Sequence, residues 1–216
     1  MAGIDPFLAT SWPLVPGRTA LVVIDPQNDF LHRDGWYAKS GVDISHMQAS
    51  IGPTKRLVAA ARERRVPVIW TRHGFRGMHD AGPFIEQRPF LRDGGLRQGT
   101  WGYEILAELK PRPDEHIIEK MRLSAFFQTS LEIVLRSLGT ETVLFAGVLT
   151  NQCVAATSKD ASFRDFKPIV VAEATGTTLP HLHAPALEMM KVGWAEVRSL
   201  DQAEADLRRL PLTNAP

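Results

Sequence analysis

Short apolar runs rich in β-branched residues alternate along the chain with longer stretches in which apolar residues recur about every three or four positions. The short runs are typical of strands buried in a parallel sheet, and they predict strands at 19–25, 66–72, 115–120, 141–148, 167–173 and, with a weaker pattern, 195–200. The longer period predicts helices at 47–65, 103–109, 129–138, 152–164 and 184–192, with a last helix from Gln202.

This alternation of strands and helices predicts an α/β fold, because a helix between two parallel strands covers the sheet that the strands form. We expect a mostly parallel sheet with helices on both faces and right-handed crossovers. In such folds functional groups gather at the carboxyl ends of the strands. Candidate chemistry is therefore sought at those ends.

Prolines are closely spaced in the first 17 residues of the chain. Pro6, Pro13 and Pro16 interrupt any ladder or helix there, so we expect an N-terminal arm at 1–17 with little regular structure. The remaining length fits one domain of ordinary size, which we place at 18–210.

Two long stretches without a clear period, 31–43 and 73–102, are predicted to be irregular loops. A compact domain rarely keeps such loops unless they bind or cover something. Their aromatic residues have two explanations, packing onto the sheet or lining a pocket. These residues are Trp36, Tyr37, Phe75, Phe84, Phe90 and Trp101.

The composition narrows the class of partner. Apolar residues make up 44% of the 216 residues and charged residues 23%, which is typical of a globular protein, and the net charge of +1 gives no field to hold nucleic acid or anionic lipid. One cysteine makes no intramolecular disulfide, and no apolar run is long enough to span a bilayer. The N-terminus lacks the pattern of a signal peptide. We expect a cytoplasmic protein with a small-molecule partner, without a membrane or nucleic acid.

Three chemically active residues follow strand ends. Asp25 ends the first strand in VVIDPQNDF, Lys120 ends the third in IIEKMRLSAFF, and Cys153 follows the fourth in FAGVLTNQC. Each alone has a structural explanation: a turn-starting aspartate, a solvated lysine and a small buried cysteine. Because the carboxyl ends of parallel strands share one edge of the sheet, the three are predicted to meet there.

Together these residues predict nucleophilic chemistry. A thiol attacks as thiolate, and both a helix N-terminus and the nearby Lys120 would lower the pKa of Cys153. Asp25 would accept the thiol proton and return it to a departing amine. The backbone N–H groups of Leu149 and Cys153 would form an oxyanion hole for an attacked carbonyl.

VVIDPQNDF, the lysine followed by RLSAFFQT, and GVLTNQCV resemble the isochorismatase-like cysteine hydrolases, over about residues 19–200. The resemblance implies a Rossmann-like three-layer sandwich with a six-stranded parallel sheet flanked by helices. It also implies a triad of Asp25, Lys120 and Cys153, a cis peptide at Val148–Leu149, and a homodimer or homotetramer.

Members of the nicotinamidase type carry a metal-binding Asp-x-His after the second strand. Here WTRHGFRGMHD keeps His73 and His79 but has no aspartate at the required spacing from a histidine. We therefore expect neither a metal nor another cofactor, and we interpret both histidines as ordinary loop residues.

RLSAFFQTSLEIVLRSLG and FAGVLTNQCVAAT are most similar to ureidoacrylate amidohydrolases, with biuret and N-carbamoylsarcosine hydrolases as relatives. We expect an amidohydrolase that cleaves a small amide or ureido C–N bond through a covalent thioester-type intermediate, with a ureidoacrylate-like substrate favoured. The alternatives are a biuret or other small-amide hydrolase, an isochorismatase-type vinyl ether hydrolase, and a catalytically silent homologue that binds a metabolite.

Cys153 favours acyl transfer over vinyl ether cleavage. Leu123 and Leu149 depart from the expected aromatic and small residues, which alters the expected pocket shape.

A planar urea offers several N–H donors and one carbonyl, so its pocket needs acceptors. The substrate-binding candidates are the amides Gln27, Asn28 and Asn151, the carboxylate clamp Arg122, and the pocket walls Phe30 and Phe126. The amides have an alternative explanation in turn and cap chemistry, the arginine as a solvated charge, and Phe126 as plain core.

Overall fold

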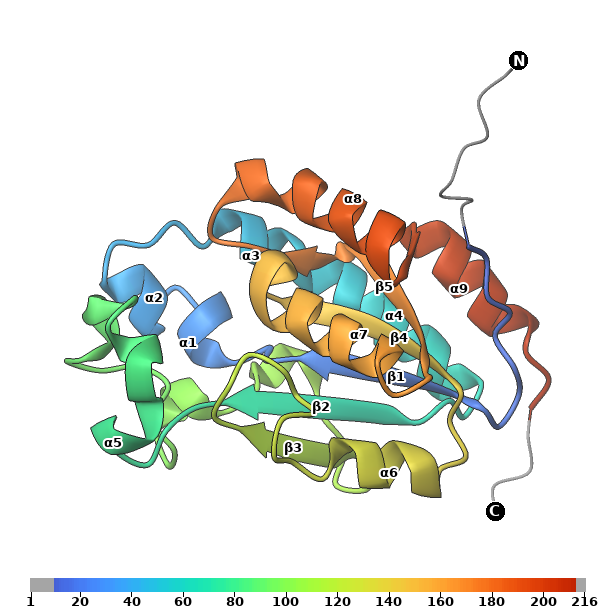
Figure 1. Ribbon diagram of the computed structural model, residues 1–216, viewed down its shortest axis with the longest axis horizontal. Helices are drawn as coiled ribbons and strands as arrows, with labels where there is room; N and C mark the ends of the chain where they lie inside the picture. Colours follow the sequence, from blue (N-terminus) through green and yellow to red (C-terminus); the bar gives the residue numbers. More distant parts are fainter. Residues whose placement is uncertain (1–9, 213–216) are drawn as a thin grey trace.

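The computed structural model describes residues 10–212, in which six parallel strands form one sheet (Figure 1). The strands are β1 (Thr19–Ile24), β2 (Val68–His73), β3 (His116–Lys120), β4 (Thr142–Val148), β5 (Lys167–Gly176) and β6 (Glu196–Arg198). Their order across the sheet is β3-β2-β1-β4-β5-β6, and every neighbouring pair is parallel. The predicted parallel α/β fold is confirmed.

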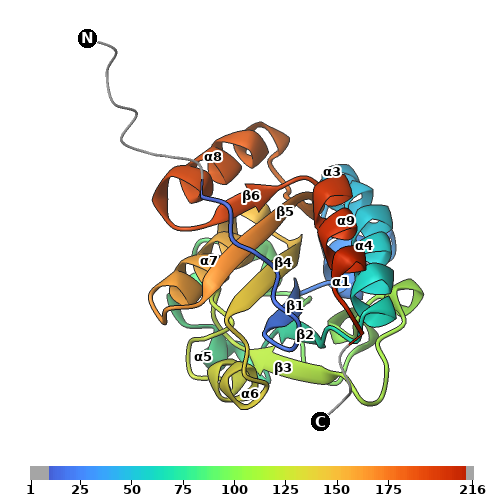
Figure 2. The same ribbon diagram turned by 90° about the vertical axis from the view of Figure 1, so that its right-hand side faces the viewer.

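Helices cover both faces of this sheet, as the end-on view in Figure 2 shows. On one face lie α4 (Ile51–Glu63) and α9 (Leu200–Arg209), which pack against each other. On the other face lie α6 (Leu131–Ser137), α7 (Ala155–Ser162) and α8 (His183–Gly193). The result is the three-layer arrangement that the alternating pattern predicts.

The central strand β1 contributes side chains to the hydrophobic core on both faces of the sheet. Successive side chains of a strand point to opposite faces. Leu21 and Val23 therefore join the core cluster beneath α4 and α9, whereas Val22 and Ile24 join the cluster beneath α7. All six residues of β1 are buried, which explains its continuous apolar run.

Two predicted helices differ from the structure. The pattern at 47–65 divides into α3 (Ser45–Ala49) and α4, because Pro53 lacks the N–H that a continuous helix needs. The segment 103–109 forms no α-helix; it contains only short 3-10 turns, since its backbone instead bonds to the segment after β1, with the N–H of Leu106 donating to the Pro26 carbonyl (2.8 Å).

The stretches predicted to be irregular contain short helices. They include α2 (Trp36–Lys39) and α5 (Met78–Ala81), and α1 (Asn28–Leu31) precedes the first of them. The buried carboxylate of Asp29 accepts from the Trp36 N–H (3.0 Å) and from the Leu96 N–H (2.6 Å). One side chain thus joins the two stretches. Both stretches lie at the carboxyl end of the sheet (Figure 1).

The described part of the predicted arm, 10–17, contains no helix or strand and lies along β6. The Trp12 N–H donates to Glu196 (2.7 Å), and Arg198 donates to the Trp12 carbonyl (2.9 Å). The rest of that predicted arm, 1–9, lies outside the described residues. None of the helices within 10–212 combines the length and apolar character that crossing a bilayer requires.

Candidate active site

Asp25 follows β1 directly and is held by the neighbouring strand β2. Its backbone N–H donates to the Thr71 hydroxyl (3.0 Å), which in turn donates to Asp25 Oδ1 (2.5 Å). The other oxygen, Oδ2, faces the Lys120 ammonium at 2.8 Å. Thr71 therefore fixes the carboxylate and leaves one oxygen available for proton transfer.

Lys120, the last residue of β3, reaches over β2 toward this carboxylate. Its Nζ lies 2.8 Å from Asp25 Oδ2 and donates to Cys153 Sγ (3.3 Å) and to the Arg122 carbonyl (3.0 Å). Its side chain has no exposed surface. The three donors of the ammonium thus each face an acceptor, as a buried charge requires.

Cys153 lies in a π-helical turn, Thr150–Val154, that links β4 to α7. The peptide bond between Val148 and Leu149 is cis, at the position that the resemblance implied. The Leu149 carbonyl accepts from the N–H groups of Gln152 (3.0 Å) and Val154 (3.1 Å), which closes the turn. The carboxyl ends of β1, β3 and β4 therefore bring carboxylate, ammonium and sulfur together.

The electrostatics of Cys153 differ from the sequence-based expectation. Burial raises the pKa of its thiol to about 12; Lys120 acts to lower this pKa, and Asp25 acts to raise it. The expected lowering of the thiol pKa is therefore wrong, because desolvation outweighs the neighbouring ammonium. Burial also disfavours the Lys120 ammonium, but attraction to Asp25 and Cys153 outweighs that effect and raises its pKa.

His73 was expected to be an ordinary loop residue, and this expectation is wrong. It is the last residue of β2, it is buried, and its register partner in β3 is Lys120. Burial and the Lys120 charge hold its pKa well below the usual range, and it makes a hydrogen bond to the Met121 backbone. Its Nε2 has no partner among the described residues, so the neutral ring presents a free acceptor.

Side-chain atoms of Asp25, His73 and Cys153 lie within 4.8 Å of one another, a geometry with which three such groups could hold a metal ion. The Lys120 ammonium already lies 2.8 Å from the carboxylate and 3.3 Å from the sulfur. A second cation at that spacing would be strongly repelled in so buried a place. The donor set therefore fits an ammonium better than a metal.

Two candidate substrate-binding amides, Gln27 and Asn28, form hydrogen bonds with backbone groups. Gln27 Nε2 donates to the carbonyls of His73 and Tyr103 (both 3.0 Å), and its Oε1 accepts from the His73 N–H (2.7 Å). Asn28 Nδ2 donates to the Trp101 carbonyl (2.7 Å). These bonds fit the alternative explanation of both amides as structural links between segments.

The candidate aromatic walls belong to the core. Phe30 is buried against Tyr37, with ring centroids 4.7 Å apart. Phe126 stacks on Phe166 (5.9 Å) beneath the other face of the sheet, and Leu123 packs against the same cluster. Phe30 and Phe126 are both buried in apolar surroundings, as core residues usually are.

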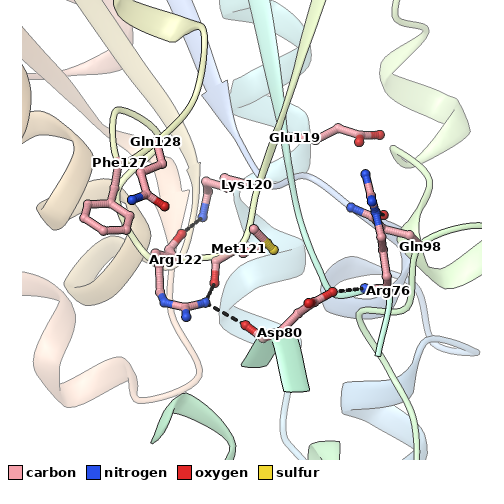
Figure 3. A pocket seen from close by; sticks show the side chains of 9 residues that line it. All are labelled: Arg76, Asp80, Gln98, Glu119, Lys120, Met121, Arg122, Phe127 and Gln128. Atoms are coloured by element: carbon pink, nitrogen blue, oxygen red, sulfur yellow. Dashed lines mark hydrogen bonds between the residues drawn. The ribbon is translucent and has the colours of Figure 1, made fainter. Parts of the chain in front are cut away.

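Asn151 and Arg122 lie beside other cavities. Asn151 Oδ1 accepts from the Thr177 hydroxyl (2.7 Å), and this residue lines a mostly apolar hollow next to α8. Arg122 donates to the carbonyls of Asp80 and Met121 (both 2.8 Å), and in Figure 3 its guanidinium points toward Asp80. The cavity there has a volume of about 350 Å³ and borders Lys120, whose side chain is sealed from it.

A different cavity, of about 230 Å³, adjoins the turn that carries Cys153; we term it the entrance cavity. Its lining includes Gln152 from that turn and Leu149 directly before it. Tyr37 and Arg88 line it from the two long stretches. Burial raises the pKa of Tyr37 above its usual value, so this phenol stays neutral in the cavity wall.

Sequence reasoning missed Thr71 and Arg88, interpreted His73 as an ordinary loop residue, and left Tyr37 open between packing and lining a pocket. A stricter search of strand ends would have found His73, the last residue of β2, and Thr71 two residues before it. Tyr37 and Arg88 lie in stretches where no periodic pattern of apolar residues predicts the local structure. Only the tertiary structure brings them to the site.

The parallel sheet and the cysteine, lysine and aspartate at its carboxyl edge define the class of isochorismatase-like α/β hydrolases. The chain belongs to the isochorismatase family: the family model described as "Isochorismatase domain" matches residues 19–202.

Individual relatives agree with this assignment. The chain is 34% identical over 174 residues to the ureidoacrylate amidohydrolase RutB of Pseudomonas savastanoi pv. phaseolicola, covering 74% of this chain and 71% of that protein. A cysteine hydrolase from Pseudomonas syringae pv. phaseolicola superimposes with a TM-score of 0.86 at 26% identity, covering 94% and 98% of the two chains. N-carbamoylsarcosine amidase from Thermoplasma acidophilum gives 0.71 at 26% identity, covering 85% and 97%.

Proposed function

We propose that the protein is a cysteine-dependent amidohydrolase that cleaves the C–N bond of a small ureido compound, with a ureidoacrylate-like substrate favoured. The observation that carries the proposal is the contact of Lys120 Nζ with both Asp25 Oδ2 (2.8 Å) and Cys153 Sγ (3.3 Å) in a buried site. Support for the substrate class comes from the relatives named ureidoacrylate amidohydrolase and N-carbamoylsarcosine amidase.

In the first half of the proposed reaction, the Cys153 sulfur attacks the carbamoyl carbon while Asp25 takes the thiol proton. The raised pKa of Cys153 means that this proton leaves during the attack, when Asp25 is next to it. The N–H groups of Leu149 and Cys153 stabilise the negative oxygen. The amine then departs with the proton that Asp25 holds, and the carbamoyl group stays on the sulfur.

In the second half, a water molecule attacks the carbamoyl carbon and gives a proton to Asp25. The C–S bond breaks, carbamate leaves, and the sulfur regains its proton from Asp25. Lys120 remains charged throughout, because its pKa is raised, and it stabilises the negative charge that passes between sulfur and carboxylate.

His73 has a place in the proposed binding of the substrate. One ring nitrogen of His73 lies within 4.8 Å of the ligand atoms of Asp25 and Cys153, and its Nε2 has no partner among the described residues. A neutral imidazole nitrogen accepts a hydrogen bond. We assign this acceptor to a ureido N–H group. Asp25, Lys120 and Cys153 would then act on the carbonyl that His73 helps to orient.

The test is intact-mass analysis of the protein during turnover of ureidoacrylate analogues, biuret, carbamoyl amino acids and nicotinamide. We expect the ureido compounds to leave one carbamoyl group on a peptide that contains Cys153, and we expect no adduct and no turnover in Cys153→Ala. A folded wild-type protein that hydrolyses none of these compounds would instead support the silent homologue. A vinyl ether hydrolase would instead act on an added vinyl ether, without needing the thiol.

The homodimer or homotetramer implied by the resemblance is part of the proposal. Phe163 and Met189, on or next to α7 and α8, are 69% and 65% exposed, and such side chains favour contact with another copy. Light scattering of the purified protein at several concentrations tests this. A monomer at all concentrations would contradict it.

A further inference from the structure

The entrance cavity carries an unbalanced charge. Among the described residues that line it, Arg88 is the one charged side chain, and the rest are amides, aromatics, aliphatic groups and a threonine. Arg88 is partly buried. A lone cation in the wall of a cavity beside a buried nucleophile favours an anionic ligand.

The contacts of Arg88 hold it in place without neutralising it. Its Nη2 donates to Gln152 Oε1 (2.6 Å), its Nη1 to Gln87 Oε1 (3.3 Å), and its Cζ lies 4.0 Å from the centre of the Phe84 ring. Within 10–212 no carboxylate lies within ion-pair distance of this guanidinium. Amide oxygens and a ring face orient the planar group and leave donors for a carboxylate.

Arg88 also lies at a suitable place relative to the sulfur. Gln152, its hydrogen-bond partner, directly precedes Cys153, and the Phe84 ring beneath it contacts the His73 ring at 5.1 Å between centroids. His73 is within reach of Cys153, as the 4.8 Å limit on their ligand atoms shows. A short ligand with its carbonyl at the sulfur would therefore extend its far end toward Arg88.

We propose that Arg88 binds the carboxylate of a ureido acid, in which the acid lies a few bonds from the carbamoyl carbon, and so selects anionic ureides over neutral ones. The inference rests on the proposed function and deepens it. A guanidinium matches a carboxylate in a bidentate pair, which gives the contact both strength and direction. Arg122, the sequence-based candidate for this clamp, is held by carbonyls at another cavity.

The test compares N-carbamoyl-β-alanine with propylurea, which has a methyl group in place of the carboxylate. We expect Arg88→Gln to raise the KM for the acid about ten- to hundredfold, with little change in kcat and a much smaller change in KM for propylurea. Arg88→Lys should bind the acid better than Arg88→Gln but less well than the wild type. Lysine keeps the positive charge but lacks the planar pair of donors that a guanidinium offers to a carboxylate. Arg92→Gln, an exposed arginine of the same stretch, is the matched control for net charge.

Two outcomes would overturn the inference: an equal rise in KM for both compounds in Arg88→Gln, or the selective loss appearing in Arg122→Gln instead. Binding of both compounds to Cys153→Ala, measured by calorimetry, separates this inference from the proposed function. Arg88-dependent binding of the acid supports the inference even if the wild type turns over neither compound. Failure of the acid to bind, or binding that Arg88→Gln leaves unchanged, contradicts it.

Discussion

The Lys120 ammonium lies 2.8 Å from the Asp25 carboxylate, and neither side chain has any exposed surface. A buried pair of this kind costs desolvation free energy that the two charges offset for each other. Removal of one partner leaves the other charge buried without compensation. Catalytic function and stability are therefore coupled at this contact.

We expect Lys120→Met to abolish turnover and to lower the free energy of unfolding by about 3–5 kcal/mol, because it leaves the Asp25 charge unpaired. Adding Asp25→Asn should recover part of the stability but none of the activity. Urea denaturation of the single and double variants measures both steps. Equal stability of the single and double variants would contradict the coupling.

The reactivity of the thiol should follow its raised pKa. In the free protein, alkylation of Cys153 by iodoacetamide should be slow near neutral pH and should still be rising at about pH 10, where a thiol of ordinary pKa approaches its plateau. Asp25→Asn should react faster than wild type at the same pH, since it removes a charge that raises the thiol pKa. A wild-type rate that levels off well below about pH 8.5 would show that the thiol is activated without substrate.

His73 should make stability depend on pH. Burial, and then the charge of Lys120, depress its pKa in the folded state, so below about pH 6.5 the unfolded chain binds a proton that the folded chain does not. The free energy of unfolding should therefore fall as pH decreases, by up to about 1.4 kcal/mol per pH unit from this group. Measured by urea denaturation, the free energy of unfolding of His73→Asn should fall less steeply than that of the wild type as pH decreases. His79→Asn, at an 86% exposed side chain, should follow the wild type.

Gly147 in β4 should not tolerate a side chain. Its φ of +106° is unfavourable for other residues, and a Cβ there would lie 2.1 Å from the Ile24 carbonyl oxygen of β1. We expect Gly147→Ala to lower the free energy of unfolding by roughly 3 kcal/mol or more, measured by urea denaturation. Gly52→Ala, in α4 with open space around it, is the control and should not destabilise. Equal stability of the two variants would contradict this account of β4.

The sequence predicted the sheet well because strands buried on both faces carry an unmistakable apolar run, as in β1. It predicted the helix at 103–109 wrongly, since its local period did not reveal that Leu106 bonds to the backbone after β1. Local pattern decides an element only where no distant partner competes for its backbone hydrogen bonds.

The candidate active site likewise has some features that the sequence determines and others that only the tertiary structure decides. The sequence by itself determined the fold class and the strand ends on which Asp25, Lys120 and Cys153 stand, because parallel strands necessarily bring their carboxyl ends to one edge. Only the tertiary structure decided how deeply the sulfur is buried, and hence the direction of its pKa, because desolvation depends on surrounding atoms that no motif specifies. It also decided that Arg88, rather than Arg122, borders the entrance cavity, because contacts between distant segments fold the long stretch that carries Arg88.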